Sequence, residues 1–173
     1  MDLVEISTIF LLEVFTINGL KNQILREVGA VARCIHTLAD VKYREINLQR
    51  GQFTFLTRIV EHPGVNLAEL SVLLKVDKTT TTKAVQKLMA AGYVQRERDA
   101  ADARMWRLVP TELALDVYPG IIAEENNSID ICFAGFSAAE RDAALSLIGR
   151  MRANIEKEWL ERKQGGGGED DDD

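Results

Sequence analysis

Five polar side chains of one segment, residues 78–91, recur at spacings that place them on one face of a helix. They are two hydroxyls, two ammonium groups and one amide, contributed by Thr79, Thr82, Lys83, Gln86 and Lys87. Short hydroxyls can approach base edges or phosphates, lysine brings charge to phosphates, and glutamine can pair with an adenine edge. Thr81, Val85 and Leu88 share the opposite, inward face. The pattern predicts a helix that enters the major groove of double-stranded DNA.

An alternative interpretation treats the four consecutive threonines as a poor helix start with solvated side chains. Threonine is a weak helix former because its branched side chain is restricted in a helix. A run of four therefore costs helix stability where alanine would not. We interpret that cost as a sign that the hydroxyls have a use.

A second group of polar side chains follows in a predicted hairpin over residues 93–109. Asp102 and Arg104 are separated by one residue, so an extended strand would project both to the same side. We call this hairpin the wing. We expect Asp102 to orient it by binding an arginine side chain, either Arg104 itself, Arg98 or Arg107. Arg104 is predicted to enter a minor groove, whose concentrated negative potential attracts arginine. The alternative is an ordinary solvated hairpin tip with a surface ion pair.

The elements that must position these side chains can be read from apolar spacing and from helix caps. Asn66 with Glu69, and Ser137 with Glu140, are capping boxes, and Asp77 is a strong helix start. Pro119 should kink or break the helix that contains it. The predicted helices cover residues 21–46, 49–61, 66–74, 77–91, 111 onward, and 137 to near 162, and the predicted strands cover residues 93–98 and 105–109.

This order predicts a mainly α fold with a small β-wing: a winged helix-turn-helix with long N- and C-terminal dimerisation helices. The outer helices have more apolar surface than a small winged core can cover, which indicates a homodimer. The predicted domain limits are 1–48 for the N-terminal arm and dimerisation helix, 49–110 for the DNA-binding lobe, 111–164 for the C-terminal dimerisation helices, and 165–173 for a disordered acidic tail.

The net charge of -6 over 173 residues conceals an uneven distribution. Five acidic residues stand at 169–173, which leaves a net charge of -1 for residues 1–164. Residues 75–107 hold eight lysines and arginines and four acidic residues, a local charge of +4. A basic segment on a nearly neutral body is typical of a DNA-binding protein.

The remaining features exclude several classes of protein. Two cysteines, Cys34 and Cys132, stand far apart without a CxxC, which favours the reducing cytoplasm and buried, unreactive thiols. The apolar segment 1–20 is interrupted by Glu5 and Glu13, so we expect an arm buried against a partner and no membrane partner. No catalytic motif is present, so the chain is not expected to be an enzyme.

We expect no metal and no cofactor. Cys34 and His36 are one residue apart, which directs them to different sides of a helix, and the chain has only two histidines. Tyr43, Phe53, Phe55 and Trp106 could line an aromatic effector pocket, or equally belong to the core. No residue is assigned to an effector.

Three segments together resemble the MarR family of bacterial winged helix-turn-helix repressors. They are GQFTFL, LAELSVLLKVDKTTTTKAVQKLMAAGYV and RERDAADARMWRLVPT. Asp77 through Leu88 matches the family's recognition-helix pattern, with Thr81 in place of an apolar residue. Asp99, Asp102 and Arg104 fill the family's D-x-x-D-x-R wing pattern.

The resemblance implies an obligate homodimer that binds a pseudo-palindrome through successive major grooves, with half-sites about 34–36 Å apart. It also implies release from DNA by a small-molecule effector or by thiol oxidation. An alternative from another class is a winged-helix protein-interaction module without DNA binding, in which the apolar arm and the acidic tail contact a protein or mask the basic face.

Overall fold

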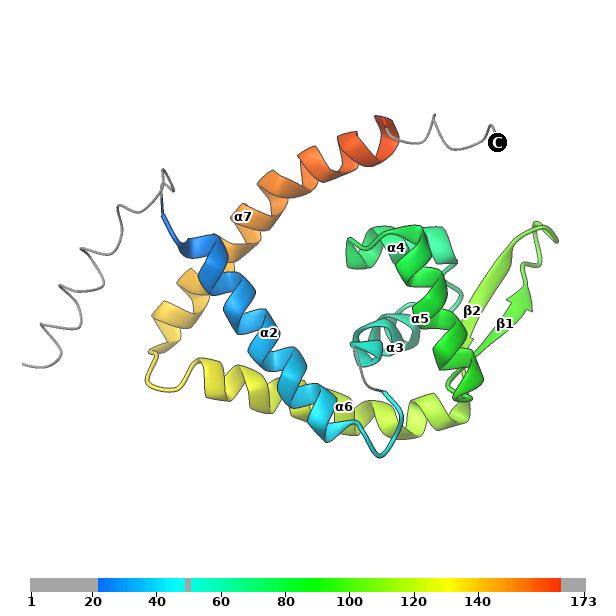
Figure 1. The fold of residues 1–173 in the computed structure, drawn as a ribbon, viewed down its shortest axis with the longest axis horizontal. Coiled ribbons are helices and arrows are strands. Elements are labelled where there is room, and N and C mark those ends of the chain that lie inside the picture. Colours follow the sequence, from blue (N-terminus) through cyan, green and yellow to red (C-terminus); the bar gives the residue numbers. More distant parts are fainter. Residues whose placement is uncertain (1–21, 49–50, 166–173) are drawn as a thin grey trace, which may run out of the picture. The chain divides into compact units, whose positions relative to one another are not determined.

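The computed structural model describes residues 22–48 and 51–165, and Figure 1 shows their arrangement. The predicted N-terminal arm and nearly all of the predicted acidic tail lie outside these residues. The elements in chain order are α2 (Ile24–Lys42), α3 (Gln52–Glu61), α4 (Leu67–Leu74), α5 (Lys78–Ala90), β1 (Val94–Arg98), β2 (Trp106–Pro110), α6 (Glu112–Cys132) and α7 (Ala138–Gly165). The predicted mainly α fold with a small β-wing is confirmed.

The described residues form two compact units, one up to Glu125 and one from Asn126 onward. The first unit contains a closed hydrophobic core beneath α3, α4, α5 and the hairpin. Its largest fully buried apolar side chains are Leu48, Leu56, Ile59, Leu70, Val85, Leu88 and Leu108, joined by Ile121 from α6. We call residues 51–110, which supply most of this core, the winged lobe.

Local signals in the sequence explain where α4 and α5 begin and end. The Asn66 side chain accepts hydrogen bonds from the amides of Ala68 and Glu69, while Glu69 accepts from the Asn66 amide, so the predicted capping box is confirmed. At the end of α5, Gly92 has a φ of 81°. The following amide, that of Tyr93, donates to the Leu88 carbonyl at 2.9 Å, which closes the helix end.

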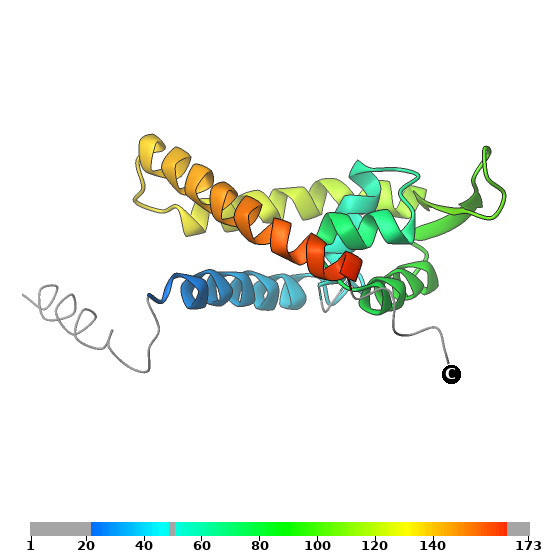
Figure 2. The same ribbon diagram turned by 90° about the horizontal axis from the view of Figure 1, so that it is seen from above.

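The hairpin pairs β1 and β2 in antiparallel register, from Val94 opposite Pro110 to Arg98 opposite Trp106. Strand β2 is also hydrogen-bonded to the segment between α3 and α4. The Leu108 amide donates to Val65 at 3.0 Å, and the Gly64 amide donates to Leu108 at 2.9 Å. In Figure 1 and Figure 2 the hairpin projects beyond α5. The wing is therefore held to the segment between α3 and α4 through β2, and its tip extends beyond α5.

The first long helix is shorter than predicted. It ends at Lys42 instead of continuing to residue 46, because the chain turns there to bury Tyr43 and Leu48, which are 4% and 0% exposed. Asn47 adopts a left-handed φ of 55° to make this turn. The next helix begins at Gln52, after Gly51 with a φ of 70°, and the predicted start at residues 49–50 lies outside the described residues.

The C-terminal helices were predicted to kink or break at Pro119 and to end near Arg162. Pro119 does not break α6, which runs through it without interruption. Proline inside a helix costs about 3 kcal/mol, but Ala114 and Ile121, 0% and 1% exposed, hold both sides of it against the core. The last helix is 28 residues long and ends at Gly165, beyond the predicted end near Arg162. Arg152–Glu156 and Glu158–Arg162 ion pairs, four residues apart, support its extension.

Candidate nucleic-acid interface

The start of α5 is fixed by Asp77. Its side chain accepts a hydrogen bond from the Thr80 amide at 2.7 Å, which satisfies one of the free amides of the first turn. That bond is the main reason why the pKa of Asp77 is lowered from its ordinary value. The predicted cap is confirmed, and it defines where the helix begins.

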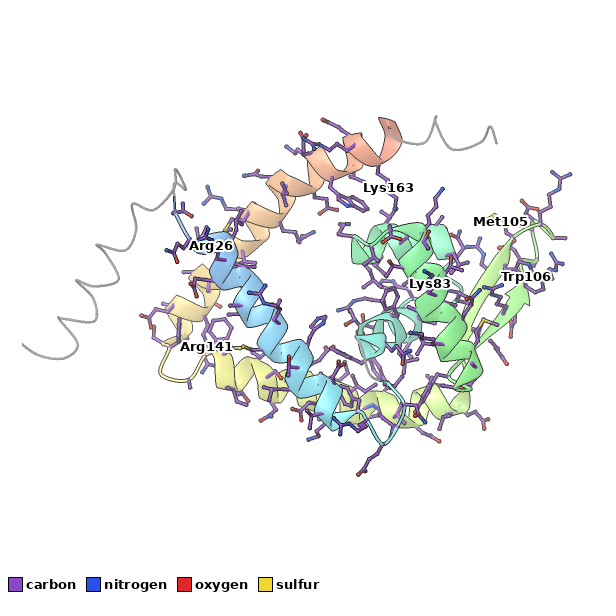
Figure 3. The ribbon with its side chains drawn as sticks, in the orientation of Figure 1. Arg26, Lys83, Met105, Trp106, Arg141 and Lys163 are labelled. Atoms are coloured by element: carbon purple, nitrogen blue, oxygen red, sulfur yellow. The ribbon has the colours of Figure 1, made fainter. Side chains whose placement is uncertain are left out.

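The two faces of α5 divide as the sequence predicts. Thr81, Val85 and Leu88 are all 0% exposed and face the core. On the other face Thr79, Lys83, Gln86 and Lys87 are exposed, and Thr82 is half-buried. Figure 3 shows Lys83 on this helix. The five predicted contact residues therefore share one accessible face, while their contact with DNA stays a prediction.

The threonine hydroxyls are partly used within the helix. The Thr82 hydroxyl donates to the Lys78 carbonyl at 2.8 Å, and the Thr81 hydroxyl donates to the Asp77 carbonyl at 2.9 Å. A hydroxyl that donates one hydrogen bond still has an oxygen that can accept others. Thr82 is thus suited to accept from a donor such as a base amino group, and such a contact would leave its bond to Lys78 in place.

The wing tip, residues 99–105, is organised by Asp99. Its Oδ1 accepts from the amides of Ala101 at 2.7 Å and Asp102 at 2.9 Å. Its Oδ2 accepts from the Arg107 guanidinium. This hydrogen bond from Arg107, followed by the two backbone amides, lowers the pKa of Asp99 to about 2.

Asp102 acts differently from the prediction. Within the described residues it holds no arginine side chain; its Oδ1 accepts from the Arg104 backbone amide at 2.9 Å. Nor do Asp102 and Arg104 lie on an extended strand, since the strands end at Arg98 and resume at Trp106. The two residues sit in the turn itself, where aspartate commonly bonds an amide two residues on. Asp102 orients the backbone of Arg104, whose side chain is exposed.

Arg107 connects the wing to the helix-turn-helix, a role that sequence reasoning assigned to no residue. Besides its pair with Asp99, it donates to the Gly64 carbonyl at 3.2 Å and to Glu69 at 3.4 Å. The Asp99 carboxylate, followed by Glu69, raises the pKa of Arg107. The sequence does show Asp99, the first aspartate of the D-x-x-D pattern. That Asp99 lies close to Arg107 follows only from the register of the hairpin, which the sequence does not show.

Several secondary predictions need correction. Cys34 and Cys132 are exposed rather than buried. The apolar residues near each cysteine, on α2 and α6, are themselves exposed. Apolar neighbours in the sequence therefore did not indicate that the cysteines are buried. Of the four aromatic residues left between a pocket and the core, Tyr43, Phe53 and Phe55 are buried in the core, and Trp106 is 42% exposed on the wing. A different, open depression is lined by His62, Pro63, Gly64, Val65, Glu69 and Leu73.

The described residues contain no group of three or more side chains arranged to hold a metal ion. Among the same residues, no helix combines the length and the apolar character needed to cross a membrane.

The order α3, α4, α5 and hairpin, with an exposed polar face on the third helix and an arginine at the hairpin tip, defines a winged helix-turn-helix protein. The MarR-family model matches residues 46–105. The HTH-type transcriptional regulator YybA of Bacillus subtilis is 35% identical over 144 residues, covering 83% of this chain and 96% of the relative. The chain belongs to the MarR family of transcriptional regulators, a class of proteins that are not enzymes.

Solved structures agree with this assignment. A MarR protein from Peptoclostridium difficile is 52% identical, with a TM-score of 0.82, and the match covers 85% of this chain and 96% of that one. A MarR-family regulator from Listeria monocytogenes, solved in complex with a 26mer DNA, is 32% identical, with a TM-score of 0.78 over 82% of this chain and 94% of that chain.

Proposed function

We propose that the protein is a cytoplasmic homodimer that binds pseudo-palindromic operators as a repressor and is released from them by a small-molecule effector. In this proposal the major groove is contacted by Thr79, Thr82, Lys83, Gln86 and Lys87, and the minor groove by Arg104. The single observation that carries the proposal is that one winged helix-turn-helix exposes both the polar face of α5 and the arginine of the wing tip.

The charge of this face supports a polyanionic partner. Within the residues that the structure describes, Lys83, Lys87 and Arg104 have no acidic partner, whereas Arg107 in the same lobe is paired with Asp99 and Glu69. Unpaired cations on one face attract phosphate and release its counterions on binding. The DNA complex of the Listeria monocytogenes relative is consistent with this partner.

The homodimer is supported by the exposed apolar residues of the outer helices, each considered separately. On α2 the exposed side chains are Ile24, Leu25, Val28, Val31, Leu38 and Val41. On α7 they are Leu145, Leu147, Ile148 and Ile155. Large contiguous apolar surfaces on a soluble protein usually mark an interface. A second copy of the chain would cover these faces and place two recognition helices about 34–36 Å apart, as successive major grooves require.

The test begins with selection of genomic fragments by the purified full chain and footprinting of the best fragment. We expect a protected pseudo-palindrome whose affinity falls steeply with salt. Arg104→Ala should weaken binding about tenfold or more, and Lys87→Ala should weaken all sequences similarly and lower the salt slope by about one unit. Arg150→Ala, which removes an exposed cation from α7, is the matched control and should change neither quantity.

Weak, uniform binding at low salt, with no protected site, would contradict the proposal and favour a protein-interaction module. If a site is protected, the neighbouring promoter gives the direction of regulation. Candidate effectors can then be screened by their ability to lower the affinity of the wild-type protein for that site.

A further inference from the structure

An exposed tryptophan stands at the start of β2, beside the wing tip. Trp106 is 42% exposed, and the Arg98 guanidinium carbon lies 3.9 Å from the centre of its ring. Figure 3 shows Trp106 with Met105 on the hairpin. Arg98 and Trp106 are directly opposite in the β1–β2 register, so their side chains project from the same face. The stacking is therefore a cross-strand cation–π contact at the last pair of the ladder.

The same guanidinium reaches across the turn. Arg98 Nη1 donates to the Ala103 carbonyl at 2.6 Å. Ala103 directly precedes Arg104, so this bond holds the peptide unit that links the two residues. The planar guanidinium can stack on a ring and donate in its own plane at once. Arg98 thus joins Trp106, at the end of the hairpin next to the turn, to the backbone immediately before the predicted DNA-contacting arginine, Arg104.

The rest of the tip is held by other groups. Asp99 accepts from the amides of Ala101 and Asp102, and Asp102 accepts from the Arg104 amide. The Met105 amide donates to the Asp102 carbonyl at 2.9 Å. Arg98 and Asp102 therefore hold the two ends of the peptide unit between Ala103 and Arg104: Arg98 binds its carbonyl oxygen, which neither aspartate can do, and Asp102 binds its amide.

We propose that Arg98 is a positioning residue: stacked on Trp106, it closes the wing tip and presents Arg104 in the conformation that binds DNA. The proposal rests on the proposed function for its effect on affinity. A loop that is already ordered loses less conformational entropy on binding, so its contact yields more affinity. Trp106 is exposed because its ring serves as the platform for Arg98 rather than as part of the core.

The first test uses the free full-length protein and needs no DNA. Aliphatic and guanidinium protons of Arg98 should show an upfield ring-current shift in the NMR spectrum, which Trp106→Ala should abolish. In both Trp106→Ala and Arg98→Ala, the Arg104 amide should exchange with solvent faster than in the wild type. Unshifted Arg98 resonances in the wild type, or unchanged exchange in both variants, would overturn the proposal.

The second test measures affinity for the selected operator duplex in a double-mutant cycle. We expect Arg98→Ala to weaken binding about fivefold in the wild type but less than about twofold in the Arg104→Ala background, because residues that act through one contact are not additive. Trp106→Ala, which alters no charge, should match Arg98→Ala. Trp106→Phe keeps an aromatic face and should restore affinity to within about twofold of the wild type.

Two results in the cycle would contradict the positioning role. An equal loss from Arg98→Ala in both backgrounds, with the salt slope reduced by about 0.9, would make Arg98 a phosphate contact of its own. An additive loss from Trp106→Ala and Arg98→Ala would make Trp106 an independent contact. If the wild type binds no operator, the proposed function fails, while the NMR test still decides whether Arg98 closes the tip.

Discussion

The winged lobe and helix α2 differ in how far their apolar side chains are buried. In the lobe, Leu56, Ile59, Leu70 and Leu88 are all 0% exposed and pack against one another within a single chain. In α2 only Ala39 is buried, although the helix has an apolar residue at almost every turn. The apolar side chains of the lobe are covered within the chain, whereas α2 has an apolar stripe that needs a covering surface.

This difference in burial suits the two regions to different roles, the lobe to DNA reading and α2 to association with a partner. A closed core can hold α5 and the wing in fixed relation, which a DNA-reading surface requires. An uncovered stripe gives no rigidity to its own chain, but it can specify a partner. Substitutions in the two regions should therefore disturb different measurable quantities.

The largest effect is expected from Leu88→Ala, at the centre of the inward face of α5. The side chain is 0% exposed, and removing a fully buried leucine leaves a cavity that typically costs about 3 kcal/mol of unfolding free energy. Chemical denaturation followed by circular dichroism measures the loss. Leu115→Ala is the matched control, because Leu115 is also helical but 51% exposed. Equal losses in the two variants would mean that the lobe core is not the main source of stability.

A smaller effect, on association rather than folding, is expected from Leu38→Glu on α2. Leu38 is 56% exposed and belongs to the apolar stripe. A carboxylate buried in an interface is costly unless it is paired, so the dimer should dissociate about tenfold or more readily. Sedimentation equilibrium gives the dissociation constant, and circular dichroism should show the lobe still folded.

Thr37→Glu provides the comparison for that variant. Thr37 is the adjacent exposed residue, and its hydroxyl donates to the Arg33 carbonyl within the helix. The same charge placed one position away should leave association nearly unchanged. Equal dissociation constants for Leu38→Glu and the wild type would remove this stripe from the dimer interface.

The features that sequence reasoning predicted well are those decided within a few residues. The capping box at Asn66, the cap at Asp77 and the inward positions Thr81, Val85 and Leu88 depend on spacing inside one helix. Such interactions form wherever the helix forms. For the same reason the accessible face of α5 could be derived before any tertiary contact was known.

The features that were missed depend on contacts between distant segments. The end of α2 is set by burial of Tyr43, whose hydroxyl donates to the Ile121 carbonyl at 3.3 Å. The unbroken passage of α6 through Pro119 depends on burial on both sides of that residue. In the wing, the choice of Asp99 rather than Asp102 as the partner of Arg107 depends on where the turn begins. No local pattern contains these distances.

The smallest effect concerns the Asp99–Arg107 charge pair, which joins the wing tip to β2. The pKa of Asp99 is lowered from an ordinary 3.8 to about 2, first by the Arg107 hydrogen bond and then by two backbone amides. A carboxyl whose folded pKa is lowered stabilises the fold above its ordinary pKa, and that contribution disappears as the pH falls from about 4 towards 2. Order in the wing tip should be lost over the same range.

Arg107→Ala should raise the pKa of Asp99 towards 3.8, because its largest cause is removed while the two amides remain. The carboxyl carbon resonance of Asp99, followed by NMR as a function of pH, measures the change. Asp77 is the internal control: the Thr80 amide is the main cause of its lowered pKa, so the substitution should leave that pKa where it is. If Asp99 in the variant still titrates near 2, the amides alone fix the tip, and Arg107 serves only to tie the wing to Gly64 and Glu69.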